Sequence, residues 1–154
     1  MEFHAETPSA DRLTTALSAL EAGTKPAWGK LDAPGMVQHV NRFMELYLGE
    51  RKMGGFAGWM ARHLGKVFLR RVAVKSPFET PRNLATAPVL AVRSGADFAE
   101  EVERFAALLG QIEALSGTYD HPVYGAMPAD DVKGLVRHHT AHHFFQFGLL
   151  SREG

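Results

Sequence analysis

The sequence predicts an all-α domain, a four-helix bundle with a long crossover between its second and third helices. Four segments repeat apolar residues at the three- and four-residue spacing of amphipathic helices. Between the second and third segments lie 48 residues (97 minus 49), far more than the short loops that join antiparallel neighbours. We therefore expect the second and third helices to run parallel, within one domain that spans residues 1–154.

The first two helices are predicted from their end signals and apolar spacing. Residues 7–23 begin with threonine in a capping position, Pro8 suits the first turn, and leucines recur until a terminal glycine. The second helix is predicted to begin at Asp32, with Pro34 in its first turn. It should end near Gly49, because glycine favours helix termination.

The last two helices of the expected bundle follow the long connection. The third is predicted over residues 97–117, beginning at Asp97, and the fourth over residues 128–150. Asp130 and Asp131 would lie in the first turn of the fourth helix, where the helix dipole favours negative charge. The intervening segment TYDHPVYGAMP is expected to form a loop.

The connection between the second and third helices is expected to contain some structure. Residues 56–74 mix apolar and basic side chains in a pattern typical of a short amphipathic helix. Packing on the bundle is favoured over binding to a membrane surface, because the chain as a whole is neutral. The next stretch holds Pro77, Pro81 and Pro88 and is expected to be extended.

Composition excludes several function classes. Seventeen Lys and Arg balance seventeen Asp and Glu, so no net charge attracts the chain to nucleic acid. Cysteine is absent, which excludes disulfides, thiolate-bound zinc and iron–sulfur clusters, so nitrogen or oxygen must hold any transition metal. The chain shows neither a targeting segment nor eighteen consecutive apolar residues. We therefore expect a soluble, cytoplasmic protein.

Histidine is the residue type that points to chemistry. The chain has eight, and four of them lie within HHTAHH in the predicted fourth helix. With Val132 taken as the centre of the core-facing side and about 100° of rotation per residue, His139 and His143 fall within about 20° of that centre. His138 and His142 fall at or beyond the edge of the apolar stripe. His139 and His143 are therefore the predicted inward pair.

A third inward histidine comes from the predicted second helix, where His39 lies on the apolar face. Three clustered buried imidazoles are hard to satisfy with hydrogen bonds alone. We therefore expect His39, His139 and His143 to bind one divalent metal ion and to leave a coordination position open. Gln146 shares the inward stripe, either as an outer-shell partner of the metal site or as an ordinary core amide.

The remaining histidines have other interpretations. His142 is a candidate for the outer shell of the site, and both it and His138 could instead face substrate or solvent. His121 lies in HPVYG, a turn-like segment that favours a structural role over ligation. HHTAH lacks the glutamate of HExxH metalloproteases. For the whole cluster, the alternative is a set of hydrogen-bonded core histidines without metal.

Three segments, WGKLDAPGMVQHV, HPVYG and HHTAHHFFQFG, resemble the DinB/YfiT-like metalloenzyme superfamily, and within it the domain-of-unknown-function family 1569. The resemblance covers nearly the whole chain and is strongest at HxxxHxxQ, here His139, His143 and Gln146. It implies a four-helix bundle with a divalent metal ion, zinc or nickel, held by one histidine of the second helix and two of the fourth. By position these ligands are His39, His139 and His143.

The resemblance also implies a class of function. Relatives include transferases that use low-molecular-weight thiols such as bacillithiol or mycothiol, and an open metal site suits either thiol transfer to a small electrophile or hydrolysis. We expect a metal-dependent enzyme with a small-molecule substrate and with no nucleic-acid or membrane partner. The alternatives are a noncatalytic metal-binding or stress-response protein, and a helical interaction protein. A homodimer is expected only from the frequency of dimers among soluble proteins.

Overall fold

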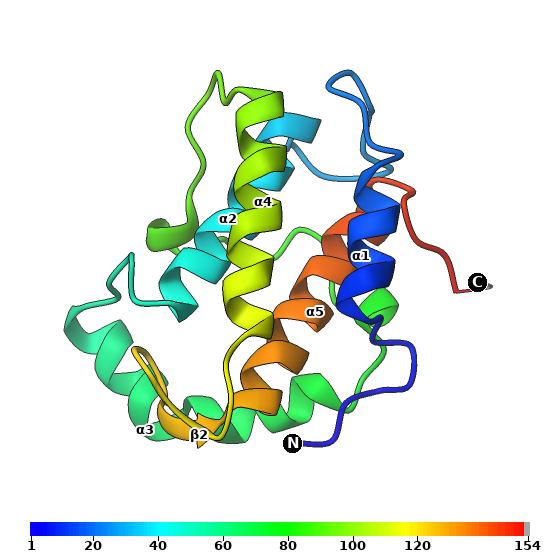
Figure 1. Ribbon diagram of the computed structural model, residues 1–154. Helices are drawn as coiled ribbons and strands as arrows, with labels where there is room; N and C mark the ends of the chain where they lie inside the picture. Colours follow the sequence, from blue (N-terminus) through cyan, green and yellow to red (C-terminus); the bar gives the residue numbers. More distant parts are fainter. Residues whose placement is uncertain (153–154) are drawn as a thin grey trace.

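The computed structural model describes residues 1–152 and contains, in that range, five α-helices and a two-stranded antiparallel sheet (Figure 1). The predicted all-α four-helix bundle is therefore wrong, because a fifth helix and a β-hairpin join the four expected helices. The elements in chain order are α1 (Ala10–Leu17), α2 (Ala33–Tyr47), α3 (Gly55–Ala73), η1 (Pro77–Glu79), η2 (Pro88–Leu90), α4 (Phe98–Glu113), β1 (Thr118–His121), β2 (Gly125–Pro128) and α5 (Ala129–Gln146).

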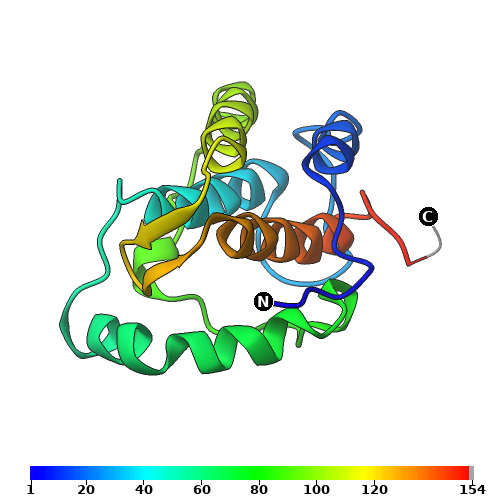
Figure 2. The ribbon, with the colours of Figure 1, turned by 60° about the horizontal axis from the view of Figure 1, so that its bottom comes forward.

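The helices form three layers (Figure 2). Helices α1 and α4 make one outer layer, α2 and α5 the middle layer, and α3 the other outer layer. The hydrophobic core lies between the first two layers, where Leu13, Val40 and Phe144 are fully buried and Phe105 almost fully. Helices α2 and α4 both run downward in Figure 1, the parallel course that the long connection predicts.

Local capping chemistry sets the beginnings of the helices. The Asp32 carboxylate accepts a hydrogen bond from the Gly35 amide at 2.8 Å, and Asp97 accepts one from the Glu100 amide at 2.9 Å. The sequence predicted that these two helices begin at Asp32 and Asp97. Helix α1 begins later than expected, since Ser9 is its cap and the Thr7 amide is already bonded to a turn carbonyl.

The segment expected to be a loop between the last two helices is a β-hairpin. Its strands are only four residues long, too short to show the alternation that identifies a strand in a sequence. The hairpin is held to α2 by Tyr119, whose hydroxyl donates to the Tyr47 carbonyl oxygen at 2.7 Å. Directly after the turn, strand β2 begins at Gly125 with φ +75°, a conformation that suits glycine.

The long connection contains a helix where the sequence predicted one. Helix α3, predicted over residues 56–74, spans Gly55–Ala73 and is the longest helix in residues 1–152. The proline-rich stretch after it is not uniformly extended, because Pro77 and Pro88 each begin a 3₁₀ turn. None of the helices in residues 1–152 combines the length and apolar character needed to cross a membrane.

Candidate metal centre

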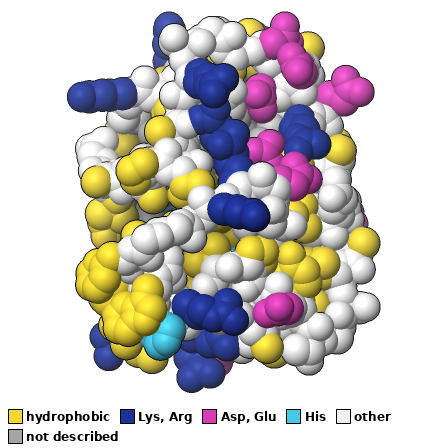
Figure 3. All heavy atoms as spheres, turned by 90° about the vertical axis from the view of Figure 1, so that its left-hand side faces the viewer, with side chains coloured by type: hydrophobic (Ala, Val, Ile, Leu, Met, Phe, Trp, Pro, Cys, Tyr) yellow, Lys and Arg dark blue, Asp and Glu magenta, His cyan; other side chains and the backbone are white. Residues whose placement is uncertain are grey.

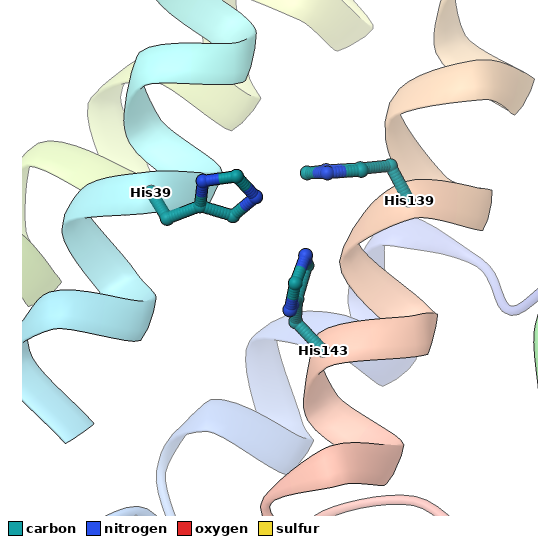
Figure 4. A group of neighbouring side chains, drawn as sticks. All are labelled: His39, His139 and His143. Atoms are coloured by element: carbon teal, nitrogen blue, oxygen red, sulfur yellow. The ribbon is translucent and has the colours of Figure 1, made fainter. Parts of the chain in front are cut away.

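Helices α2 and α5 bring three imidazole rings together in the middle layer of the protein. His39 projects from α2, and His139 and His143 project from successive turns of α5 toward the same space (Figure 4). The ring centroids lie 4.6 to 5.1 Å apart. One ring nitrogen from each histidine lies within 4.8 Å of the other two. The structure thus assembles the trio that periodicity selected.

The spacing of these nitrogens fits a metal ion after small movements. Zinc binds histidine nitrogen at about 2.0–2.1 Å, so three ligand nitrogens arranged tetrahedrally on one ion lie about 3.3 Å apart. The candidate nitrogens lie within 4.8 Å of one another, so each would have to move by about 1 Å or less toward a common centre, a change that side-chain rotation can supply. The three residues could therefore hold a metal ion without movement of either helix.

Hydrogen bonds orient two of the three rings. Nδ1 of His39 lies 3.3 Å from the Leu90 carbonyl oxygen, and Nδ1 of His143 lies 2.9 Å from Oε1 of Gln146. Both oxygens only accept, so each Nδ1 carries the proton and donates. The Nε2 lone pairs of His39 and His143 are then available to a metal, the arrangement that outer partners impose on histidine ligands.

The third ring is oriented by packing. His139 stacks on Phe43 with centroids 3.9 Å apart and an interplanar angle of 10°. Its Nδ1 is buried without a hydrogen-bond partner among residues 1–152. Because a buried, unpartnered polar atom is costly, this ring is the least satisfied of the three in the absence of a ligand.

Burial keeps the three imidazoles neutral. Desolvation is the largest cause of the lowered pKa of His39, which a hydrogen bond with Leu90 partly offsets. Burial also lowers the pKa of His139 well below its usual value, and that of His143 to about 3. Neutral imidazole is the form that binds metal, so at neutral pH all three rings are ready to act as ligands.

Gln146 connects the site to the loop that precedes α2. Its Oε1 accepts from His143 and its Nε2 donates to the Trp28 carbonyl oxygen at 2.8 Å. Gly29 beside this bond adopts φ +87°, and a Cβ there would lie 2.5 Å from Nε2 of Gln146. Only glycine therefore lets the loop approach this amide so closely. Gln146 thus contacts a candidate ligand directly, as one of its two predicted roles required.

His142 and His138, the other two histidines of HHTAHH, lie outside the trio. The His142 ring lies 5.0 Å from that of His143 and 6.1 Å from that of Trp28, measured between centroids. His142 therefore lies next to the three-histidine site, between His143 and Trp28. His138 turns away, and its Nε2 bonds the Lys75 carbonyl oxygen at 2.9 Å, which fixes the chain after α3.

His121 has a structural role, as predicted. The ring is fully buried, and its Nδ1 accepts hydrogen bonds from the amides of Val123 and Tyr124 at 3.0 and 3.2 Å. These bonds shape the turn of the hairpin. Burial lowers the pKa of His121 to about 3, so the ring stays neutral and can accept.

Three contributors to the site were missed by the sequence analysis. Two are the main-chain carbonyls of Leu90 and Trp28, which carry no side-chain signal. The third is Phe43, whose ring stacks on that of His139. Its spacing of four from His39 on the same helix face is the one signal that linked it to the site.

A family model described as a protein of unknown function, DUF1569, matches residues 4–148 of the chain. No curated protein and no solved structure matches the chain.

Proposed function

Because the chain belongs to the DUF1569 family, whose function is unknown, we propose its function from the site: His39, His139 and His143 bind one divalent metal ion that acts on a small molecule. The convergence of three neutral imidazoles carries this proposal. Two are oriented by acceptors and the third is left with an unpartnered nitrogen. A purely structural cluster would instead satisfy its ring nitrogens within the protein.

The ligand set also bears on the reaction. The three candidate ligands are neutral, and no Asp or Glu among residues 1–152 joins their group. A divalent ion held there would keep its full charge in a desolvated site and would favour an anionic further ligand. Such an ion supplies Lewis-acid stabilisation that lowers the pKa of a thiol or of water.

We therefore infer transfer of a low-molecular-weight thiol to a small electrophile, with hydrolysis of a small molecule as the second candidate. A thiol suits the site better, because it ionises more readily than water and offsets the ion's charge. The DinB/YfiT-like superfamily, which the motifs of this chain resemble, supports the same three-histidine chemistry. Zinc or nickel is the proposed metal, since imidazole ligands suit both ions.

Residues of the chain have defined roles in this proposal. Leu90 and Gln146 hold the Nδ1–H of two ligands, and Phe43 holds the plane of the third and excludes water from one of its faces. The His142 ring lies 5.0 Å from that of His143 between centroids, so we assign His142 to the edge of the substrate site. Trp28 and Phe145, 5.5 Å apart between centroids, line the same side.

Elemental analysis tests metal binding. We expect untagged protein, purified without chelator, to hold about one zinc or nickel ion per chain. The His143→Ala variant should lose at least a hundredfold in metal affinity, because one of three protein ligands is removed. His63→Ala is the matched control, since His63 is an exposed histidine of α3 and its loss should leave the metal content unchanged. Equal metal contents in wild type and His143→Ala would contradict the assignment.

Thiol binding separates an enzyme from a noncatalytic metal protein. In cobalt-substituted protein, bacillithiol or cysteine should produce the intense near-ultraviolet absorption of cobalt–sulfur bonding. The protein should also make the same thiol react with the electrophile monobromobimane faster than the thiol does without protein. A protein that melts at lower temperature without metal, yet shows neither effect, would be a metal-stabilised protein without thiol-transfer activity.

A further inference from the structure

Helix α3 exposes the apolar residues that a helix normally buries. Six large hydrophobic side chains of this helix and its cap are more than half exposed, and Figure 3 shows hydrophobic groups gathered near the bottom of one face, beside Lys and Arg side chains. These side chains, here called the α3 apolar face, are Phe56, Trp59, Leu64, Val67, Phe68 and Val74.

The α3 apolar face points away from the protein. At about 100° per residue, its members within the helix lie within about 90° of one direction, on a side of the helix that they share with His63, Arg70 and Arg71. Leu69 and Ala73, the two buried residues of α3, lie on the opposite side. On that inner side the Lys66 ammonium donates to the Ala126 carbonyl oxygen at 2.6 Å, so a basic residue contacts the hairpin while aromatic rings face outward. Core packing therefore does not explain the apolar pattern of α3.

The charge around this face is strongly one-sided. Residues 51–78 contain seven Lys and Arg and no Asp or Glu. The whole chain has 17 of each sign, so the remaining residues hold 10 basic and 17 acidic groups, a formal charge of −7. The zero net charge of the whole chain argued against binding to an anionic surface. It is, however, the sum of a formal charge of +7 on residues 51–78 and −7 on the rest of the chain.

We propose that the α3 apolar face lies in the surface of an anionic lipid bilayer. A helix that lies in the interface buries aromatic and aliphatic side chains at the acyl boundary, while Lys and Arg at its edges reach the headgroups. The 19 residues of α3 extend about 28 Å along that surface. The acidic remainder of the chain is repelled by the same lipids, which orients the protein with α3 toward them.

Charge argues against the other occupants. A second copy of this chain would bring two segments of +7 together, a repulsion that apolar contact would have to overcome. Nucleic acid would use the cations but has no place for Leu64 and Val67, since its affinity comes from phosphates and base stacking. The proposal replaces the sequence-based expectation of packing on the bundle, because α3 leaves these side chains uncovered.

Vesicle sedimentation tests the proposal. Wild-type protein should sediment with phosphatidylcholine vesicles that contain phosphatidylglycerol, at least tenfold more strongly than with phosphatidylcholine alone, and added salt should weaken the binding. Trp59→Ser/Phe68→Ser should reduce binding at least tenfold, because the buried apolar area is lost. Arg70→Gln/Arg71→Gln should weaken it about tenfold or more with the apolar face intact. Leu84→Ser, an exposed leucine outside α3, is the matched control and should bind like wild type.

Each contrary result overturns the assignment. No sedimentation of wild type with the anionic vesicles would exclude a lipid surface, as would equal binding by wild type and both double variants. A dimer in solution that Trp59→Ser/Phe68→Ser abolishes, together with no vesicle binding, would assign the face to a second copy. The substituted side chains are exposed, and circular dichroism confirms that the variants fold. Metal content is measured in parallel, so failure of this proposal is distinct from failure of the metal site.

Discussion

The α2–α5 interface and helix α3 depart from the usual burial pattern in opposite directions. Between α2 and α5 the protein brings together one buried and two half-buried histidines, and desolvation of their rings is unfavourable for the charged forms. On α3 it exposes aromatic and aliphatic side chains whose burial would be favourable. Neither departure benefits the isolated fold. In the two proposals above, a bound cation accounts for the first departure and contact with an apolar phase accounts for the second.

Truncating one aromatic residue in each region gives the largest expected contrast. Phe144 of α5 is fully buried beside Phe105, so Phe144→Ala should lower the free energy of unfolding by about 3–5 kcal/mol. Phe68→Ala on α3 should change it by no more than about 0.5 kcal/mol, because its ring is already exposed to water. Urea denaturation in the absence of lipid measures both. A large loss for Phe68→Ala would show that α3 packs more tightly than described, and would break the contrast.

The buried, neutral ring of His121 should make the stability of the protein depend on pH. The pKa of His121 falls to about 3 on folding, from an ordinary value of about 6.5 in the unfolded chain. The contribution of this pKa shift to the free energy of unfolding is therefore fully present above about pH 6.5. It is lost as the pH falls toward 3, since in that range only the unfolded state takes up the proton.

His121→Asn measures this term. An asparagine oxygen can accept the amide bonds that Nδ1 of His121 accepts, but it does not titrate. Between pH 6 and pH 4 with chelator present, the free energy of unfolding of the variant should fall less steeply than that of wild type, by about 1.4 kcal/mol per pH unit. Parallel slopes for the two proteins in urea denaturation would contradict a neutral, buried ring.

The smallest expected effect is a loss of metal affinity when the hydrogen-bond partner of His143 is removed. Gln146→Leu removes the acceptor of the His143 proton and should weaken metal binding about tenfold, because the ring loses its fixed orientation. Gln111→Leu on the exposed side of α4 is the matched control and should bind metal like wild type. Competition with a chromophoric chelator measures both affinities, and a metal-free melt shows whether each variant folds. An unchanged affinity in Gln146→Leu would remove Gln146 from the site.

Local and periodic features of this chain could be predicted, and they include the heart of the candidate site. Asp32 and Asp97 cap their helices because capping depends on residues within one turn. His39, His139 and His143 converge because the side of a helix that faces the core follows from apolar spacing alone. The hairpin was missed, since its short strands are stabilised by contacts with α2 and not by their own pattern.

The helices of the α2–α5 layer, the neutral total charge and the absence of thiolate ligands all follow from the amino-acid sequence. The orientation of the rings by Leu90 and Phe43, and the exposure of the apolar side of α3, became known from the folded chain. The difference lies in how far apart along the chain the interacting residues are. Helix periodicity depends on residues that are close together in the sequence. The hydrogen-bond partner of a carbonyl group, and the side chains that pack over a helix, come from segments far away in the chain.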